Sequence, residues 1–192
     1  MKYIIKNIND IPNSTYMDFF NKLSKNKQNK INKKIDIQDK KRSLLGLILL
    51  EELIEEKINN LDIEYSKNGK PYLKNKNIYF NISHKKDYVI TIISNKNIGV
   101  DIEYIDENKI NKSTLKYFST KTEEKNINNK ELYFTIFSLK ESYLKMKDIL
   151  FDKNMIEFEI NNNQIINNRK DINIKIINDI KNYIITICEE NV

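Results

Sequence analysis

Two acids share one face of a short predicted strand, and their types and spacing suit metal chemistry. The stretch 98–104 places β-branched and aromatic residues around Asp101 and Glu103. Side chains alternate between the faces of a strand, so both carboxylates point the same way while Val100 and Ile102 point into a core. Neighbouring carboxylates repel each other, and oxygen ligands suit Mg²⁺. The pair is therefore a candidate metal site, with the polar face of an edge strand as the alternative.

A second group of charged residues lies on a predicted helix about 40 residues further on. The segment 131–148 has a broad apolar arc at helical spacing, with Glu141 at the edge of the arc and Lys145 one turn later. Lys140 falls within the arc, where a cation needs a long stem to reach water or an anionic partner. An ordinary salt bridge between Glu141 and Lys145, worth about 0.2–0.5 kcal/mol, is the simpler interpretation of those two residues.

His84 is the only histidine, and it lies in a predicted corner between two strands. Ser83 precedes it, and Lys85 and Lys86 follow it. This set of hydroxyl, imidazole and ammonium donors suits a phosphate better than a metal ion. A hydrogen-bonded structural histidine is the alternative. Arg42 lies in the first turns of a predicted helix, where a cation is unusual unless an anion joins it.

The elements that must position these groups follow from the spacing of apolar residues. Strands are predicted near 2–8, 63–65, 78–82, 88–93, 98–104, 155–160, 172–177 and 182–188. Helices are predicted at 17–34 (basic, with a break near Asn26), 36–57, 113–118 and 131–148, and a mobile polar loop at 119–130. The order of strand, helices and strands occurs twice. The chain is therefore expected to repeat its architecture, with a boundary at the turn 95–97.

Composition limits the classes of partner. The chain has 192 residues, of which 40% are hydrophobic, enough for one domain or two small halves with a proper core. Its net charge of +6 suits an anionic partner such as a nucleic acid, a membrane surface, a phosphorylated cofactor or an acidic protein. Only two arginines occur, Arg42 and Arg169, and no compact basic tract with interleaved aromatics. A nucleic-acid partner is therefore not favoured.

Cysteine usage and hydropathy predict a cytoplasmic protein. Cys188 is the only cysteine, which excludes an internal disulfide and fits a reducing compartment. The apolar run at 1–10 is too short for a signal peptide. The longest apolar cluster, 44–50, is far too short to span a membrane, so no membrane partner is expected.

Four motifs occur in a fixed order, and their combination is far more specific than any one of them. They are Gly69-Lys70-Pro71, Phe80-Asn81-Ile82-Ser83-His84, Gly99-Val100-Asp101-Ile102-Glu103 and Phe137-Ser138-Leu139-Lys140-Glu141-Ser142-Tyr143-Leu144-Lys145. With Lys41-Arg42-Ser43-Leu44-Leu45-Gly46 upstream, they resemble the Sfp-type 4′-phosphopantetheinyl transferases over roughly residues 25–147. The resemblance implies an α+β fold, a pseudo-twofold pair of similar α/β halves. Each half would have a long helix packed on a small, mainly antiparallel sheet, at 1–97 and 98–192.

The resemblance also implies a reaction. Such enzymes transfer the 4′-phosphopantetheine group from coenzyme A to a serine of an apo acyl or peptidyl carrier protein, with Mg²⁺ (Mn²⁺ is possible), and release adenosine 3′,5′-bisphosphate. The partner supplies the nucleophile, so no Ser-His-Asp or Cys-His set is needed here. Carrier proteins are typically acidic, and the basic first half or the segment 105–130 could receive one. Carriers of fatty-acid, polyketide and nonribosomal peptide synthesis all remain open, and a monomer is expected.

The family's functional residues carry over to this chain by position. The implied metal ligands are Asp101, Glu103 and Glu141. The implied catalytic residues are Glu141, Lys145 and Asp101, with either Glu141 or a metal-bound water as the base for the serine proton. The residues matching coenzyme A contacts are Arg42, Ser83 and His84 on the 3′-phosphate side, Lys70 and Pro71 beside the adenosine, Lys140 and Lys145 facing the phosphates, and Lys27 and Lys30 near the 3′-phosphate.

The chain departs from the family pattern at three points. Phe137 replaces the usual Trp, and its packing role is expected to survive. Lys85 replaces a common Ser, which could add a phosphate contact or point to solvent. The segment 118–124 is one residue longer than the family's, so Glu123 or Glu124 could be the matching acid.

Two rival functions remain for comparison. A non-catalytic module that binds a coenzyme A-like nucleotide should lack one metal acid, whereas all three are present. A basic nucleic-acid-binding domain should show surface aromatics among its lysines and binding with a steep salt dependence.

Overall fold

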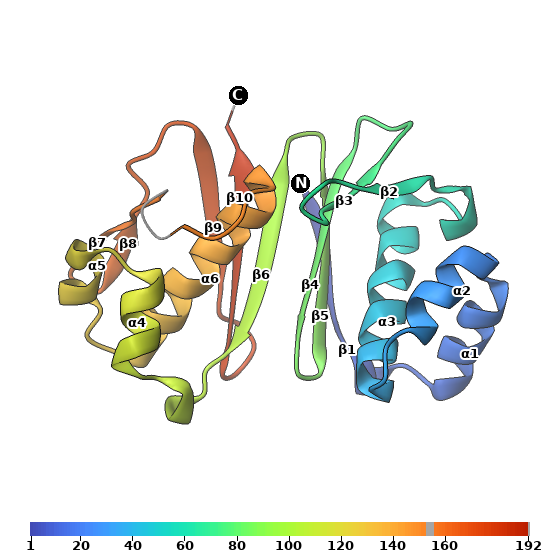
Figure 1. Cartoon of the computed structure of the whole chain (residues 1–192), viewed down its shortest axis with the longest axis horizontal. Helices are drawn as coiled ribbons and strands as arrows, with labels where there is room; N and C mark the ends of the chain where they lie inside the picture. The colour runs from blue at the N-terminus through green and yellow to red at the C-terminus, as the bar shows by residue number, and fades with distance from the viewer. Residues whose placement is uncertain (153–155, 192) are drawn as a thin grey trace.

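Two three-stranded antiparallel sheets form the centre of the computed structural model, in the residues it describes, 1–152 and 156–191. Helices cover the outer side of each sheet, which gives four layers (Figure 1). The first sheet has the order β1 (Lys2–Asn7), β5 (Tyr88–Ser94), β4 (Tyr79–Lys85). The second has the order β6 (Ile98–Tyr104), β10 (Tyr183–Glu190), β9 (Ile172–Ile177).

The elements around each sheet come in the same order. In the first half they are α1 (Asn13–Lys22), α2 (Lys25–Asn32), α3 (Ile37–Ile54) and the hairpin of β2 (Ile63–Tyr65) and β3 (Pro71–Leu73). In the second half they are α4 (Lys112–Phe118), α5 (Lys121–Asn126), α6 (Lys130–Lys147) and the hairpin of β7 (Glu159–Asn161) and β8 (Gln164–Ile166). Short 3₁₀ turns lie at Ile8–Asp10, Ile58–Asn60 and Glu107–Lys109.

The two halves share one topology. Each sheet pairs the first strand of its half with the last, and the last with the one before it. Each half places one 18-residue helix against its sheet, followed by a two-stranded hairpin. The predicted α+β fold of two similar halves is therefore confirmed. What the two halves share is the order and pairing of their elements.

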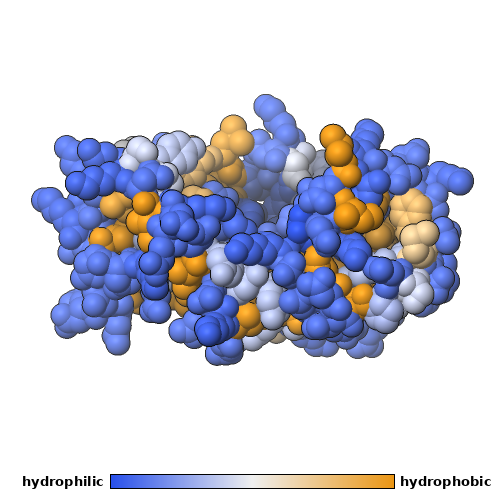
Figure 2. Space-filling view, turned by 90° about the horizontal axis from the view of Figure 1, so that it is seen from below, coloured by the Kyte–Doolittle hydropathy of each residue, from blue (hydrophilic) through white to orange (hydrophobic). Residues whose placement is uncertain are grey.

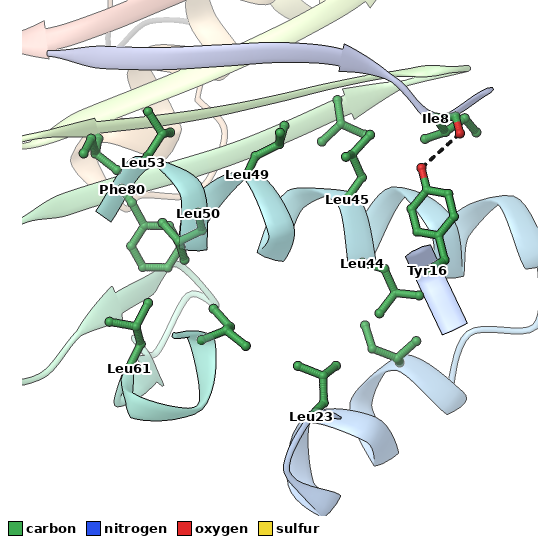
Figure 3. Close-up of a cluster of buried hydrophobic side chains, with 14 of the residues drawn as sticks. Ile8, Tyr16, Leu23, Leu44, Leu45, Leu49, Leu50, Leu53, Leu61 and Phe80 are labelled. Carbon is green, nitrogen blue, oxygen red and sulfur yellow. Dashed lines mark hydrogen bonds between the residues drawn. The ribbon is translucent and has the colours of Figure 1, made fainter. Parts of the chain in front are cut away.

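The long helix α3 shows how the local sequence builds one of these layers. The Asp36 side chain accepts a hydrogen bond from the Gln38 amide and so caps the helix start. Leucines at helical spacing then turn toward the sheet at Leu45 and Leu49, while Leu44 points the other way, toward Leu23 after α1 (Figure 3). These leucines are 0–5% exposed. Their burial holds α3 against both the sheet and the shorter helices.

The inner faces of the sheets form a separate apolar cluster between the halves. Val100 and Ile102 from β6 are 0 and 1% exposed, which confirms the prediction that they point into a core. They pack with strand residues of both halves, chiefly Ile90, Ile92, Ile185 and Ile187. Because side chains alternate along a strand, Asp101 and Glu103 lie on the opposite face of β6 from this core.

Residues 119–130, predicted as a mobile loop, are not all loop. They contain α5, and Thr120 and Glu123 form a reciprocal capping box: the Thr120 hydroxyl accepts from the Glu123 amide at 3.2 Å, and the Glu123 carboxylate accepts from the Thr120 amide at 2.8 Å. The spacing Thr-x-x-Glu is the sequence signal that predicts such a start, and the polarity of the segment masked it.

Two predicted boundaries differ from the structure. The basic helical segment at 17–34 does contain a break, but the break lies at Leu23 and Ser24, between α1 and α2, rather than near Asn26. The strand predicted near 155–160 begins outside the described residues, and β7 starts at Glu159.

The surface is mostly polar on the lower face of the molecule, with hydrophobic patches scattered across it (Figure 2). Within the described ranges, no helix combines the length and the hydropathy needed to cross a membrane.

Candidate active site

The two halves meet where β4 lies beside β6, and alternate side chains of β4 contact β6 there. The side-chain Oδ1 of Asn81 accepts a hydrogen bond from the Val100 amide at 2.9 Å. The Ser83 hydroxyl donates to Asp101 Oδ1 at 3.2 Å. Asp101 is 5% exposed, so a buried acid lies on the contact line between the halves. We call this line the seam.

Helix α6 packs on β6 at Gly99 with its backbone. A Cβ atom at Gly99 would lie 2.1 Å from the Ser142 carbonyl oxygen and 2.4 Å from the Met146 nitrogen. Only glycine permits so close an approach of helix and strand. The same part of α6 carries Lys145, whose Nζ lies 2.6 Å from Asp101 Oδ1 and 3.2 Å from Ser83 Oγ. The Gly99 contact therefore positions the charged side of α6 over the acids of β6.

The acids carry more negative charge than the seam neutralises. Asp101 Oδ2 is buried and has no hydrogen-bond partner among the described residues. Burial raises the pKa of Glu103, and the charge of Asp101 raises it further, against the opposing effect of Lys85. Burial likewise raises the pKa of Glu141, followed by Asp101, against Lys145 and Lys85. A bound cation would relieve this repulsion.

The donor set suits a hard divalent cation, although the acids do not form a ready cage. Across residues 1–152 and 156–191, no three acid, histidine or cysteine side chains stand together as a metal-binding group. Lys145 lies against Asp101, and Lys85 Nζ lies 2.6 Å from Glu103 Oε2. Carboxylate oxygens and a buried unpartnered oxygen at Asp101 nevertheless match what Mg²⁺ prefers. The assignment of Asp101, Glu103 and Glu141 as metal ligands remains a prediction.

A cavity of about 280 Å³ in the first half gathers the predicted phosphate contacts. Lys27, Lys30, Arg42 and His84 all line it, together with Lys34. His84 keeps an exposed edge, yet partial burial lowers the pKa of its imidazole, and the charges of Arg42 and Lys34 lower it further. Burial lowers the pKa of Lys27 as well, and Lys30 adds to this shift. A phosphate bound here would accept charge-assisted hydrogen bonds from these groups and relieve the repulsion between their positive charges.

Arg42 forms ion pairs with two acids of the same chain. Its guanidinium forms ion pairs with Asp39 and, at 3.6 Å, with Asp36, and it donates to the Lys86 carbonyl at 2.8 Å. The hydrogen bond from Arg42 lowers the pKa of Asp39. These acids explain a cation near the helix start without any external ligand, so its position alone no longer argues for a bound anion.

Ser83 and His84 point to opposite faces of β4. Ser83 contacts Asp101 at the seam, whereas His84 lines the cavity on the α3 side. Both were predicted to contact the 3′-phosphate side of the nucleotide. The structure brings only His84 to the other predicted phosphate contacts, because neighbouring residues on a strand alternate between faces.

A second cavity, of about 350 Å³, lies between the halves. Lys70 and Pro71 from the β2–β3 turn line it, with Glu141 and Lys145 from α6. The structure thus brings together residues that were predicted to lie near the adenosine and near the phosphates. A larger hollow of about 640 Å³ beside α1 lacks these acids and the histidine.

The β2–β3 turn also caps the end of α6 across the seam. Lys70 Nζ donates to the Met146 carbonyl at 2.8 Å and to Asn97 Oδ1 at 2.6 Å. Two residues of the turn contact Asp148: Ser66 donates to its carboxylate at 2.9 Å and Asn68 to its carbonyl at 2.6 Å. Lys70 therefore holds the two halves together, a role that the sequence analysis missed because its partners are distant in the chain.

The partly buried position of Lys70 predicts a pH-dependent contribution to stability. Burial lowers the pKa of Lys70 to about 8, below its usual 10.5. The unfolded chain therefore binds this proton more tightly, and folding stability from Lys70 rises as pH increases from 8 to 10.5. We expect a gain of roughly 1 kcal/mol between pH 8 and 10, allowing for solvent screening.

Urea unfolding of the wild type and Lys70→Met at both pH values measures this effect. The tyrosines cancel in the comparison, since both proteins contain them. An equal pH dependence in the two proteins would contradict the prediction.

Lys140 lies in a buried ion pair. Its side chain and that of Glu123 are 1 and 0% exposed, with Lys140 Nζ 2.6 Å from Glu123 Oε2. The Phe158 amide donates to the other oxygen of Glu123 at 2.9 Å. Lys140 lines neither the cavity between the halves nor the His84 cavity of the first half. Its predicted contact with phosphates remains untested, while this pairing makes Glu123, rather than Glu124, the acid joined to α6.

Breaking this pair from one side should destabilise the fold. Lys140→Met leaves the Glu123 carboxylate buried without its ammonium partner, and we expect a loss of about 3 kcal/mol in the free energy of unfolding. Denaturation in urea measures the loss. Lys130→Met, which removes an exposed partner of Glu107, is the control and should leave the free energy of unfolding nearly unchanged. Equal losses in the two variants would show that the buried pair contributes nothing special.

Two family models match the chain, one in each half. Residues 12–96 match the family model described as 4′-phosphopantetheinyl transferase, N-terminal. Residues 97–188 match the model of the 4′-phosphopantetheinyl transferase superfamily. The chain is 32% identical over 150 residues to the 4′-phosphopantetheinyl transferase gsp of Aneurinibacillus migulanus, covering 70% of this chain and 62% of that protein.

Two relatives from Bacillus subtilis match as well. The 4′-phosphopantetheinyl transferase Sfp of strain 168 is 28% identical over 156 residues, covering 76% of this chain and 67% of that protein. The 4′-phosphopantetheinyl transferase ffp is 32% identical over 121 residues, covering 57% of this chain and 53% of that protein. The chain thus spans between half and two thirds of the length of these relatives. Two adjoining family models, these relatives and the two-half fold together show that the chain belongs to the Sfp-type 4′-phosphopantetheinyl transferase family.

Proposed function

We propose that this chain transfers the 4′-phosphopantetheine group from coenzyme A to a serine of an apo acyl or peptidyl carrier protein, and releases adenosine 3′,5′-bisphosphate. The observation that carries the proposal is the meeting of buried Asp101 and Glu103 with Lys145 at the seam of a chain of this family. Such chemistry needs charge neutralisation and positioning more than a protein nucleophile.

We assign separate tasks to the two halves, 1–97 and 98–192. The change of family model between residues 96 and 97 and the repeated topology support this boundary. In the first half, the cavity of Lys27, Lys30, Arg42 and His84 would bind the 3′-phosphate side of coenzyme A. Its donors are cationic or imidazole groups, which suit phosphate oxygens.

The cavity between the halves would receive the rest of the nucleotide. Lys70 and Pro71 line it from the first half, and Glu141 and Lys145 line it from the second. A pyrophosphate placed there would meet Glu141 and two lysines, Lys70 and Lys145, in the same space. Lys140 is not given a direct contact, because its ammonium is buried against Glu123.

Asp101, Glu103 and Glu141 would hold Mg²⁺ or Mn²⁺, which supplies charge neutralisation and Lewis acidity at the pyrophosphate when bound. Lys145 lies beside Asp101 and would hold the negative charge of the leaving bisphosphate. Either Glu141 or a metal-bound water would take the proton of the carrier serine. These residues position the reacting groups, and the carrier supplies the nucleophile.

An acidic carrier protein fits the charge of this chain. The net charge is +6, and exposed lysines lie along α4 and α5 at Lys112, Lys116, Lys121 and Lys125. The basic first half is the alternative surface. Opposite charges would mainly speed the encounter, so the rate of transfer should fall as salt rises. We place the reaction in the cytoplasm and expect a monomer.

Transfer to a panel of apo carrier proteins tests the proposal. The protein is incubated with coenzyme A and Mg²⁺, and each carrier is analysed by intact mass and by mapping of the modified serine. We expect one or more carriers to gain the phosphopantetheine group on that serine. A folded protein that modifies no carrier in the panel would contradict the proposal.

One observation favours a second candidate, a module that binds coenzyme A without turnover. Lys145 and Lys85 occupy oxygens of Asp101 and Glu103 in the structure. A non-catalytic module would bind coenzyme A through the His84 cavity with the same affinity whether Mg²⁺ is present or removed. Any catalytic transfer excludes this candidate.

A further inference from the structure

Lysine ammonium groups neutralise two acids of the seam from opposite sides. Lys145 reaches Asp101 from α6, and Lys85 reaches Glu103 from the end of β4, each at 2.6 Å. Asp101 and Glu103 are 5 and 9% exposed, so water can solvate their charges only slightly and each carboxylate needs a nearby cation. The two ammonium groups therefore occupy positions beside Asp101 and Glu103 where a metal cation would otherwise bind.

The Lys85 ammonium can move away from Glu103 more easily than Lys145 can move away from Asp101. About one third of its side chain is exposed, and its Nζ joins Glu103 across the seam from the other half. A flexible four-carbon stem lets the ammonium turn into water without leaving a buried charge on the lysine. Lys145, in contrast, also donates to the Ser83 hydroxyl and belongs to the helix that carries Glu141.

Competition at Glu103 follows from these contacts. A carboxylate that binds an ammonium at 2.6 Å and also approaches Mg²⁺ would bring two like charges together. The ammonium and the divalent ion therefore exclude each other in part. Glu103 lies beside Asp101, so losing Lys85 without a replacement cation would restore the repulsion between these acids.

We propose that Lys85 is a tethered counter-ion that competes with the divalent cation for Glu103 and so sets how much Mg²⁺ the site requires. This inference rests on the proposed function only in taking Asp101, Glu103 and Glu141 as the metal ligands. Lys85 is then a positioning residue that tunes metal affinity, and it does not act on the substrate. It also stabilises the metal-free fold by neutralising Glu103.

Metal binding without coenzyme A or carrier tests the proposal. Isothermal titration with Mg²⁺ is performed on the wild type and on Lys85→Ser. We expect about fivefold to tenfold tighter Mg²⁺ binding in Lys85→Ser, because one charge-assisted contact to a ligand oxygen is removed. Lys85→Arg keeps the cation and should bind Mg²⁺ within about twofold of the wild type.

Lys86→Ser is the matched control. It removes the same charge one residue later, but the Lys86 ammonium lies over the Tyr104 ring, 3.0 Å from its centroid, and forms no ion pair with an acid in the described ranges. We expect less than a twofold change. Three results would overturn the proposal: unchanged or weaker binding in Lys85→Ser, an equal gain in Lys86→Ser, or no Mg²⁺ binding in any of these proteins. The last result would reject the metal ligands as well, whereas carrier modification by the same wild-type protein would still uphold transfer.

Discussion

Asp101→Ala should abolish phosphopantetheine transfer, with kcat/KM reduced by about a thousandfold or more. The variant removes a proposed metal ligand and the carboxylate that holds Lys145 and Ser83 at the seam. Losing several kcal/mol of transition-state stabilisation corresponds to a loss of this size. Glu141→Ala should have a similar effect, because it removes both a ligand and a candidate base.

The fold should survive these substitutions. Asp101 raises the pKa of both Glu103 and Glu141, so deleting one acid relieves repulsion between the others. Thermal unfolding of Asp101→Ala and Glu141→Ala should therefore stay close to that of the wild type, and initial rates with saturating carrier measure the activity. Glu52→Ala, which removes an exposed surface acid, is the control and should leave transfer unchanged. Normal turnover in either seam variant would reject the assignment of that acid.

Gly99→Ala should cause the largest loss of stability. The added Cβ would lie 2.1 Å from the Ser142 carbonyl oxygen, 2.4 Å from the Met146 nitrogen and 3.0 Å from the Lys145 carbonyl carbon. These are backbone atoms of α6, so no side chain can rotate away to make room. We expect a loss of about 3 kcal/mol or more in the free energy of unfolding, or failure to fold.

Gly46→Ala is the matched control for this variant. A Cβ at Gly46 would lie 2.8 Å from Cγ2 of Ile82, which is a side-chain methyl group rather than a backbone atom. We expect a smaller loss of about 1–2 kcal/mol, because the Ile82 side chain and its strand can give way by a few tenths of an ångström, whereas the α6 backbone cannot. Urea denaturation of both variants provides the comparison. A Gly99→Ala protein as stable as Gly46→Ala would show that α6 does not rest on β6 in the way described.

Much of the fold could be predicted because short-range patterns determine it. The apolar spacing of α3 and α6 predicted both long helices within a few residues, and the alternation in β6 placed Val100 and Ile102 in the core. The Asp36 side chain caps α3, and a polar residue just before an apolar helical pattern is the local signal for such a cap. These features depend on neighbours along the chain, which periodicity and capping rules describe well.

The arrangement of the site depended on contacts that no local pattern carries. Lys85 could not be paired with Glu103, nor Lys70 with Met146, because each pair joins separate elements across the seam. The contact of Lys140 with Glu123 likewise joins two separate elements, α6 and α5, so the sequence could not predict it. The motif could indicate which residue types occur there, and only the packing of elements decides which face each one takes.

Metal-dependent modification of a carrier, followed through both products, tests the proposed reaction most directly. Wild-type protein, coenzyme A and an apo carrier are incubated with Mg²⁺ or with a chelator, and the carrier mass and the released nucleotide are measured together. We predict one phosphopantetheine group on the carrier serine and an equal amount of adenosine 3′,5′-bisphosphate with Mg²⁺, and neither product with the chelator. Unmodified carrier in both conditions, or equal modification in both, would contradict transfer by a metal held at Asp101, Glu103 and Glu141.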